Sequence, residues 1–329
     1  MTLRVATFNV EDVRTTDLLD PEHPRLKRLA EVIQRVRPNI ILLNELAYDQ
    51  TGAPGFKEGD EPGQNAARFL NGFLARAAGG VAPMRFKAFT APVNTGVTSG
   101  FDLDNDGAVR TTFTHPPATG ADGKPTELPA DARGYGNDCW GFGGFPGQYG
   151  MALLVDERLE ILTDQVRTFQ RLPWSYVDGA FLPTKPEGGD WFTPEELAVA
   201  RLSSKSHWDV PVKLPNGSVL HVLCSHPTPP VFDGAEMRNK KRNHDEIRFW
   251  RDYIENAPYV VDDKNVPGGL RRMDLFVIVG DLNADPVNGD SFKNPIKTQL
   301  FSSSRINSEF TPLGEVDLTA AGLDASDTA

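Results

Sequence analysis

The feature that most constrains the fold is a set of four short apolar runs, each followed by a polar residue of a type found in catalytic sites. The runs cover residues 3–8, 39–43, 218–224 and 273–279. The polar residues that follow them are Asn9, Glu45, His226, and Asp281 with Asn283. Such runs predict buried strands, and ligand sites in α/β sheets lie beyond strand ends. Each residue alone has a structural explanation in a turn, on the surface or in the core, but the repetition favours one shared site.

The fourth run stops at Gly280, and Asp281 and Asn283 follow on either side of a single leucine. Side chains of a strand alternate in direction, so these two would point into one space if extended geometry continues past Gly280. The alternative is a strand followed by an ordinary Asp/Asn turn.

The elements between the runs indicate a layered α/β fold. Apolar residues at positions 26, 29, 30, 33 and 36 predict a helix between the first two runs, closed by Pro38. Strand, helix and strand in this order are typical of α/β architecture. Residues 148–155 and 159–162 predict a hairpin, as do residues 207–212 and 218–224. A helix over residues 243–256 follows a basic cluster, residues 238–242, that we interpret as a solvated charged face.

Residues 92–147 are rich in Gly, Pro, Asp and Thr and predict an irregular surface insertion. Asp102, Asp104 and Asp106, followed by Gly107, match the first half of a calcium loop. The twelfth position is Phe113 in place of the expected acid. A structural Ca²⁺ site completed by another part of the chain and a solvated acidic turn are both open.

Composition limits the classes of partner. The net charge of −11 argues against non-specific binding to nucleic acid or an anionic membrane. It leaves a phosphate substrate open, because a bound divalent cation inverts the local field. No apolar run reaches the length of a membrane span, and no signal segment precedes the first strand. A cytoplasmic protein is therefore the default expectation, with secretion as the alternative. We also expect a single domain over residues 1–329 and, by default, a monomer.

The strand-end residues also indicate a metal. Carboxylates and a histidine with oxygen-rich neighbours, and no cluster of thiolates, suit a hard cation such as Mg²⁺, Mn²⁺ or Ca²⁺ better than zinc. An aspartate beside such a cation suggests metal-assisted hydrolysis of a phosphoester.

Four motifs, in this order, resemble those of the endonuclease/exonuclease/phosphatase superfamily, which includes pancreatic deoxyribonuclease. They are Ala6-Thr-Phe-Asn-Val-Glu-Asp12, Asn39-Ile-Ile-Leu-Leu-Asn-Glu45, Ser225-His226-Pro227 and Val279-Gly-Asp-Leu-Asn-Ala-Asp-Pro286. The resemblance implies a four-layer α/β/β/α sandwich with two mixed β-sheets.

The resemblance also implies a role for each matching residue. Glu45 would ligate Mg²⁺ or Mn²⁺, with Asn9 nearby in the metal and phosphate network. His226 would contact the scissile phosphate, Asp281 would orient or deprotonate water, and Asn283 would bind the phosphoryl oxygens. The substrate would be a phosphoester, whether nucleic acid, phospholipid or a small molecule.

One departure from the family pattern is the missing final Asp-His pair. The last histidine of the chain is His244, so none follows Asp281. Either the chain is a truncated or processed form without its last strands, which we favour, or it is complete and catalytically inactive. A non-catalytic binding or scaffold protein on the same fold is therefore the alternative to a metal-dependent phosphodiesterase, nuclease or phosphatase.

Overall fold

The computed structural model describes residues 2–113 and 130–309, and these form two compact units that interleave along the chain. The first unit comprises Met1–Gln170, Ser203–His226 and Leu275–Asp281, and the second comprises Arg171–Leu202, Pro227–Asp274 and Leu282–Ala329. Both β-sheets belong to the first unit. The single domain over residues 1–329 stays a prediction.

The first sheet is mixed and has the strand order β1-β2-β4-β3. Its strands are β1 (Val5–Val13), β2 (Ile40–Leu46), β3 (Phe86–Phe89) and β4 (Met151–Asp156). Strands β1 and β2 are parallel, and the other two pairs are antiparallel. The predicted helix between the first two strands is α2 (Pro24–Val36), with Pro24 in its first turn and a left-handed Arg37 as its C-cap. Both strands run past the positions where their apolar runs end, so Asn9 and Glu45 lie inside strands.

The second sheet is also mixed, with the order β5-β7-β8-β9 and β6 paired to β7. Its strands are β5 (Glu160–Ile161), β6 (Arg167–Thr168), β7 (His207–Lys213), β8 (Val219–Ser225) and β9 (Leu275–Val279). The predicted hairpin of β7 and β8 is confirmed, and β8 pairs with β9 in parallel. The predicted hairpin of residues 148–155 with 159–162 is wrong, because β5 pairs with β7 of the second sheet and β4 pairs with β2 and β3. The chain thus crosses from one sheet to the other after Asp156.

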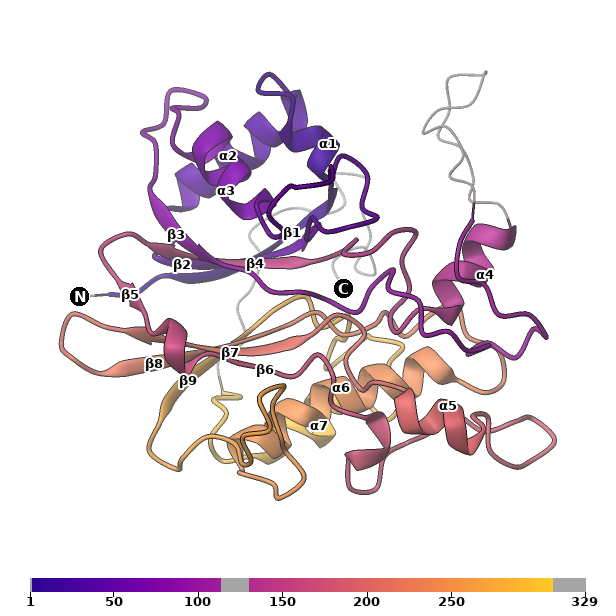
Figure 1. Cartoon of the computed structure of the whole chain (residues 1–329). Helices are drawn as coiled ribbons and strands as arrows, with labels where there is room; N and C mark the ends of the chain where they lie inside the picture. The colour runs from indigo at the N-terminus through magenta and orange to yellow at the C-terminus, as the bar shows by residue number, and fades with distance from the viewer. Residues whose placement is uncertain (1, 114–129, 310–329) are drawn as a thin grey trace. The chain divides into compact units, whose positions relative to one another are not determined.

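Two apolar cores give the first unit its layers. An outer core joins the first sheet to α2, α3 (Asn65–Phe69) and the π-helix η1 (Leu70–Leu74). An inner core joins the two sheets face to face and includes Leu42 and Leu153 from the first sheet and Trp208 and Cys224 from the second. Figure 1 shows α2 and α3 on the outer side of the first sheet. The predicted α/β class with two mixed sheets is confirmed.

The second unit holds the longest helix of the described residues. Its helices are α5 (Pro194–Val199), α6 (Arg238–Ile254), α7 (Pro295–Thr298), η3 (Trp174–Tyr176) and η4 (Leu300–Ser302). Helix α6 starts earlier than predicted, so the basic cluster forms its first turns, and Lys241 is buried rather than solvated. Asp245 of this helix accepts hydrogen bonds from Trp174 Nε1 and the Phe181 amide, both at 2.7 Å. The predicted fourth layer stays a prediction.

The remaining short helices belong to the first unit. They are α1 (Thr15–Leu18), α4 (Ala130–Asp138) and η2 (Thr163–Gln165). Among the helices of the described ranges, none combines the length and apolarity that crossing a membrane requires.

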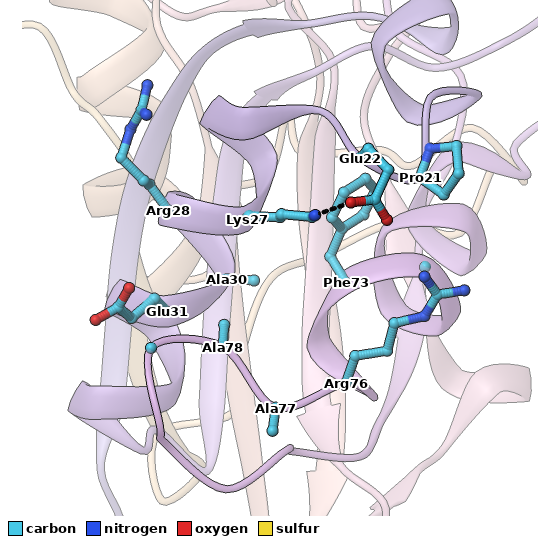
Figure 2. A pocket seen from close by; sticks show the side chains of 12 residues that line it. Pro21, Glu22, Lys27, Arg28, Ala30, Glu31, Phe73, Arg76, Ala77 and Ala78 are labelled. Carbon is cyan, nitrogen blue, oxygen red and sulfur yellow. Dashed lines mark hydrogen bonds and ion pairs between the residues drawn. The ribbon is translucent and has the colours of Figure 1, made fainter.

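A pocket of about 350 Å³ lies between α2 and η1, crossed by the ion pair of Lys27 and Glu22 (Figure 2). None of the predicted site residues lines it.

Gly280 shows how closely β9 and β8 approach at their ends. A Cβ at this position would lie 2.0 Å from the Ser225 carbonyl oxygen, and φ is +152°, which L side chains rarely adopt. We expect Gly280→Ala to lower the free energy of unfolding by about 3 kcal/mol, because the backbone must shift to relieve the overlap. Urea denaturation would measure the change.

Gly217 supplies the matched control. Its φ is +85°, but an added Cβ would meet no atom within 4 Å. Gly217→Ala should therefore cost only the backbone strain, about 1 kcal/mol. Equal losses from the two substitutions would contradict the close approach at Gly280.

Candidate active site

The site lies at one edge of the inner core. Along each strand, the side chains that face this core change there from apolar to polar. Side chains alternate along a strand, so residues two apart share a face. In the first sheet the inward rows are Val5, Thr7 and Asn9 on β1, and Ile40, Leu42 and Asn44 on β2. In the second sheet Val222 and Cys224 precede His226, and Val277 and Val279 precede Asp281. All four rows therefore end in polar residues at one edge of the inner core.

Glu45 is out of phase with these rows. Leu43 and Leu46 both face the outer core, so the alternation of β2 shifts by one residue between them. The shift falls at Glu45, whose φ is +68°. A left-handed conformation is uncommon for a residue other than glycine and is often retained at functional sites. A similar irregularity in β1, with positive φ at Glu11 and Asp12, interrupts its register with β2.

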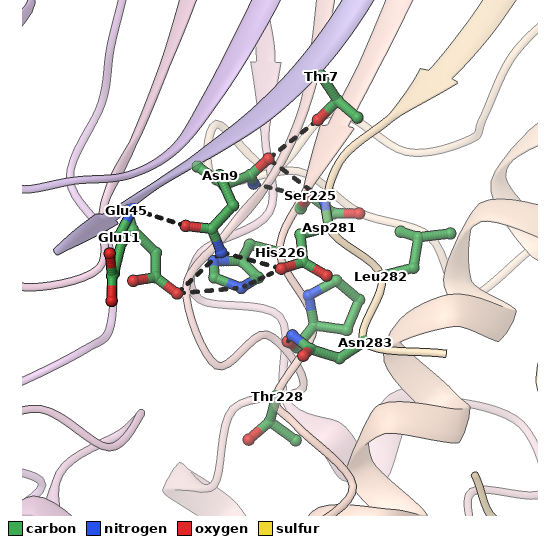
Figure 3. Close-up of polar contacts among 12 residues, drawn as sticks. Thr7, Asn9, Glu11, Glu45, Ser225, His226, Thr228, Asp281, Leu282 and Asn283 are labelled. Carbon is green, nitrogen blue, oxygen red and sulfur yellow. Dashed lines mark hydrogen bonds and ion pairs between the residues drawn. The ribbon is translucent and has the colours of Figure 1, made fainter. Parts of the chain in front are cut away.

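The side-chain amide of Asn9 joins two carboxylates. Its Nδ2 donates to Glu45 Oε1 at 3.0 Å and to Asp281 Oδ2 at 2.9 Å (Figure 3). Its Oδ1 accepts the Glu11 amide at 2.9 Å, which fixes the orientation of the side chain. Residues that lie far apart in sequence thus meet at one nitrogen atom.

His226 is buried beside these carboxylates, with 3% of its surface exposed. Its Nε2 lies 3.8 Å from Asp281 Oδ2 and 4.0 Å from Glu45 Oε1, too far for hydrogen bonds. Burial lowers the pKa of His226 well below its usual value, and the charge of Lys205 lowers it further. The imidazole is therefore neutral at pH 7. The nearby carboxylates favour a proton on Nε2, and Nδ1 has no hydrogen-bond partner within the described part of the chain.

A second group of polar residues holds the other oxygen of Glu45. The Asp12 amide donates to Glu45 Oε2 at 3.0 Å. Asp12 Oδ2 accepts Arg14 Nε at 2.9 Å and Gln148 Nε2 at 3.0 Å. Burial raises the pKa of the Tyr149 hydroxyl to about 12, and the charges of Asp12 and Glu45 add to the effect. Tyr149 therefore stays protonated beside the carboxylates.

Asn283 belongs to the second unit, where its Nδ2 donates to the Pro227 carbonyl at 3.1 Å. Its φ is +50°, so the backbone is not extended at Asn283. The expectation that extended geometry continues from Gly280 to Asn283 is therefore wrong. The role implied for Asn283 by the resemblance stays a prediction.

Two residues of this edge, Thr7 and Asn44, were not among the predicted site residues. Both continue the inward rows, and Thr7 Oγ1 donates to Asn44 Oδ1 at 3.1 Å. Extending the two-residue period from Val5 and from Ile40 would have found them.

The donor set fits a hard divalent cation. Glu45 and Asp281 supply carboxylate oxygens within hydrogen-bond distance of the same Asn9 nitrogen, while the carboxamide oxygen of Asn9 accepts the Glu11 amide. Oxygen ligands of this kind suit Mg²⁺ or Mn²⁺.

Sequence comparison places the chain in a family. The model of the Endonuclease/Exonuclease/phosphatase family matches residues 6–322. The chain belongs to this family. No curated protein matches it.

Solved structures of other family members resemble the chain distantly. A Leptotrichia buccalis family protein is 11% identical, with a TM-score of 0.42 over 90% of this chain and 74% of that one. A Beutenbergia cavernae family protein is 18% identical, with a TM-score of 0.39 over 92% of this chain and 51% of that one, so the chain spans about half its length. The human Nocturnin catalytic domain, with bound sulfate, is 11% identical, with a TM-score of 0.40 over 92% of this chain and 69% of that one. The family assignment rests on the family model alone.

Several residues of the predicted insertion are buried, while its interpretation as an irregular surface segment stays a prediction. Val93, Leu103 and Phe145 are buried, as are Asn94 and Asp138. Asp138 accepts the amides of Leu103 at 2.9 Å and Arg110 at 2.8 Å. These contacts tie the irregular segment to α4. Residues 114–129 of the insertion lie outside the described residues.

The three aspartates of the predicted calcium loop converge. Asp102, Asp104 and Asp106 each offer a carboxylate oxygen within 4.8 Å of the others. Asn137 Nδ2 donates to Asp104 at 2.8 Å, and Arg110 pairs with Asp106 at 2.5 Å, so polar neighbours already offset part of the charge. Calcium binding stays a prediction.

Calorimetry in a Glu45→Gln background would separate this cluster from the strand-end site. We expect Ca²⁺ to bind with a dissociation constant of about 10⁻⁴ M, because the loop lacks the usual bidentate acid. Asp104→Asn in the same background should weaken binding at least about tenfold. The absence of calcium heat in the Glu45→Gln protein would identify the cluster as a solvated acidic turn.

Proposed function

We propose that this chain is a divalent-metal-dependent hydrolase of phosphoester bonds that uses attack of water on phosphorus. The observation that carries the proposal is the Asn9 amide, which holds Glu45 and Asp281 beside a neutral, buried His226. Paired carboxylates with a neutral imidazole supply a ligand, a base and a hydrogen-bond donor.

Glu45, with Asn9 beside it, would hold Mg²⁺ or Mn²⁺. When bound, such a cation neutralises charge that develops on the phosphoryl oxygens. The two oxygens of Glu45 are each fixed by one hydrogen bond, from Asn9 and from the Asp12 amide. The carboxylate is thus oriented by the protein itself, which favours tight and specific binding.

Asp281 would act as the base that orients the attacking water. Its Oδ2 accepts the same Asn9 Nδ2 that donates to Glu45, so this oxygen is held close to Glu45. His226, neutral and protonated on Nε2, would donate a hydrogen bond to a phosphoryl oxygen without adding a full charge to the site. The binding of phosphoryl oxygens by Asn283 stays a prediction from the family resemblance.

The substrate class is left broad, since one fold serves many substrates. Nucleic acid, phospholipid and small phosphoesters all fit the proposed chemistry. The net charge of −11 argues against long-range attraction of duplex DNA. A non-catalytic scaffold on the same fold is the competing proposal, since a fold alone does not determine an activity.

Hydrolysis of bis(p-nitrophenyl) phosphate with and without Mg²⁺ or Mn²⁺ tests the proposal. We expect metal-dependent turnover from the full natural chain, and Glu45→Gln should reduce it at least about 10²-fold because the metal loses an anionic ligand. Glu160→Gln, the same change at an exposed acid on the edge strand β5, is the control and should leave the rate unchanged. Absence of turnover would favour the scaffold, and equal turnover in the two variants would contradict the role of Glu45 as the metal ligand.

Asp281→Asn should separate the base from the metal ligand. We expect kcat to fall about 10²- to 10⁴-fold, because the water loses its base. The affinity for Mn²⁺, measured by calorimetry, should change much less than in Glu45→Gln. An equal loss of metal affinity in both variants would make Asp281 a ligand instead.

A further inference from the structure

The carboxamide of Asn44 joins the two sheets at the edge of the candidate site. The side chain is fully buried. Its Oδ1 accepts Thr7 Oγ1 at 3.1 Å and the Asp281 amide at 3.2 Å, and its Nδ2 donates to the Ser225 carbonyl at 3.3 Å. One side chain of β2 therefore bonds to β1, to the end of β8 and to the residue that follows Gly280.

The bond to the Asp281 amide is the one that concerns function. Asn44 adjoins Glu45 in sequence and pairs with Asn9 in the register of β1 and β2. The same side chain thus fixes the backbone of the proposed base relative to the strand that carries the proposed metal ligand. The Asn9 amide then fixes the two carboxylates directly. Backbone and side chain of Asp281 are held by two different carboxamides of the first sheet.

The backbone around Asp281 needs such a contact. Gly280 has a φ of +152°, and its approach to Ser225 ends the regular pairing of β9 with β8 at Val279. The Asp281 amide lies beyond that last ladder pair and instead donates to Asn44 Oδ1. An amide carried past the end of a ladder needs a partner from a side chain or water.

We infer that Asn44 is a positioning residue, which sets the place of Asp281 relative to Glu45 across the two sheets. The expected effect of Asn44 on the reaction rate rests on the proposed function, whereas its contact with the Asp281 amide does not. A displacement of the base by about 1 Å is enough to cost about 10² in rate.

The test compares Asn44→Leu with a matched substitution at Asn39. Asn39 precedes the same strand at its other end, and its Oδ1 accepts the Arg4 amide at 2.9 Å. Asn39→Leu therefore removes a similar carboxamide contact between the first two strands without touching the second sheet. We expect Asn44→Leu to lower kcat for bis(p-nitrophenyl) phosphate about 10²-fold with KM changed less than about threefold, because the base is misplaced while binding persists. Asn39→Leu should leave kcat unchanged.

Amide hydrogen exchange at Asp281, followed by NMR, tests the contact without any need for turnover. Asn44→Leu should speed exchange of this amide about tenfold or more, because its acceptor is lost, and Asn39→Leu should not. Asn44→Asp replaces the Nδ2 donor to the Ser225 carbonyl by an oxygen but keeps an acceptor for the Asp281 amide. This amide should stay protected in Asn44→Asp, which serves if the leucine variant fails to fold.

The outcomes separate the two proposals. A wild-type protein that neither binds Mn²⁺ nor turns over substrate would overturn the proposed function, and exchange at Asp281 would still decide the role of Asn44. A wild-type enzyme in which Asn44→Leu and Asn39→Leu alter kcat and exchange alike would overturn the positioning role alone.

Discussion

The shared amide of Asn9 is the constraint on which the site depends. Two carboxylates held at one nitrogen repel each other, and a neutral His226 beside them does not offset their charge. This arrangement persists only if the first sheet, which carries Asn9 and Glu45, stays in register with the second, which Asp281 follows. The inner core supplies that register, since residues such as Leu42 and Cys224 are fully buried between the sheets. Packing of apolar side chains thus determines the geometry of the charged ones.

The transition from core to site follows directly from the strand period. Each inward row except that of β1, where Thr7 follows Val5, is apolar until it reaches the same edge, where the next residue of the same parity is polar. Buried polar groups are costly unless they are hydrogen-bonded, and this edge meets the requirement mainly with carboxamides. Asn9 and Asn44 lie side by side in adjacent strands. Asn9 Nδ2 donates to two carboxylates, and Asn44 bonds to the Thr7 hydroxyl, the Asp281 amide and the Ser225 carbonyl. Amides carry no net charge, so they can pair with carboxylates without neutralising the negative charge of these groups.

The sequence predicted most of the strands and the meeting of Asn9, Glu45, His226 and Asp281, because apolar runs and their ends are local signals, although Asn9 and Glu45 lie inside their strands. It did not predict which strands pair. Residues 159–162 looked like the partner of the strand before them, yet β5 joins β7, because tertiary packing overrides proximity in sequence. Nor could the pattern show that Asn283 adopts a positive φ, or that Glu45 reaches the site by breaking the alternation of its own strand. Asn44 was predictable from parity, but its bond to the Asp281 amide required the second sheet.

Gly280 and Glu45 both have unusual backbone geometry, for two different reasons. At Gly280 a side chain would overlap the Ser225 carbonyl, so the position is occupied by the one residue without a Cβ. At Glu45 the backbone is left-handed as well, and glycine would relieve a strain of about 1–3 kcal/mol. Glycine there would also remove the carboxylate that Asn9 and the Asp12 amide hold. The strain is retained because only a turned backbone brings this side chain, which would otherwise face the outer core, to the edge where the other polar residues gather.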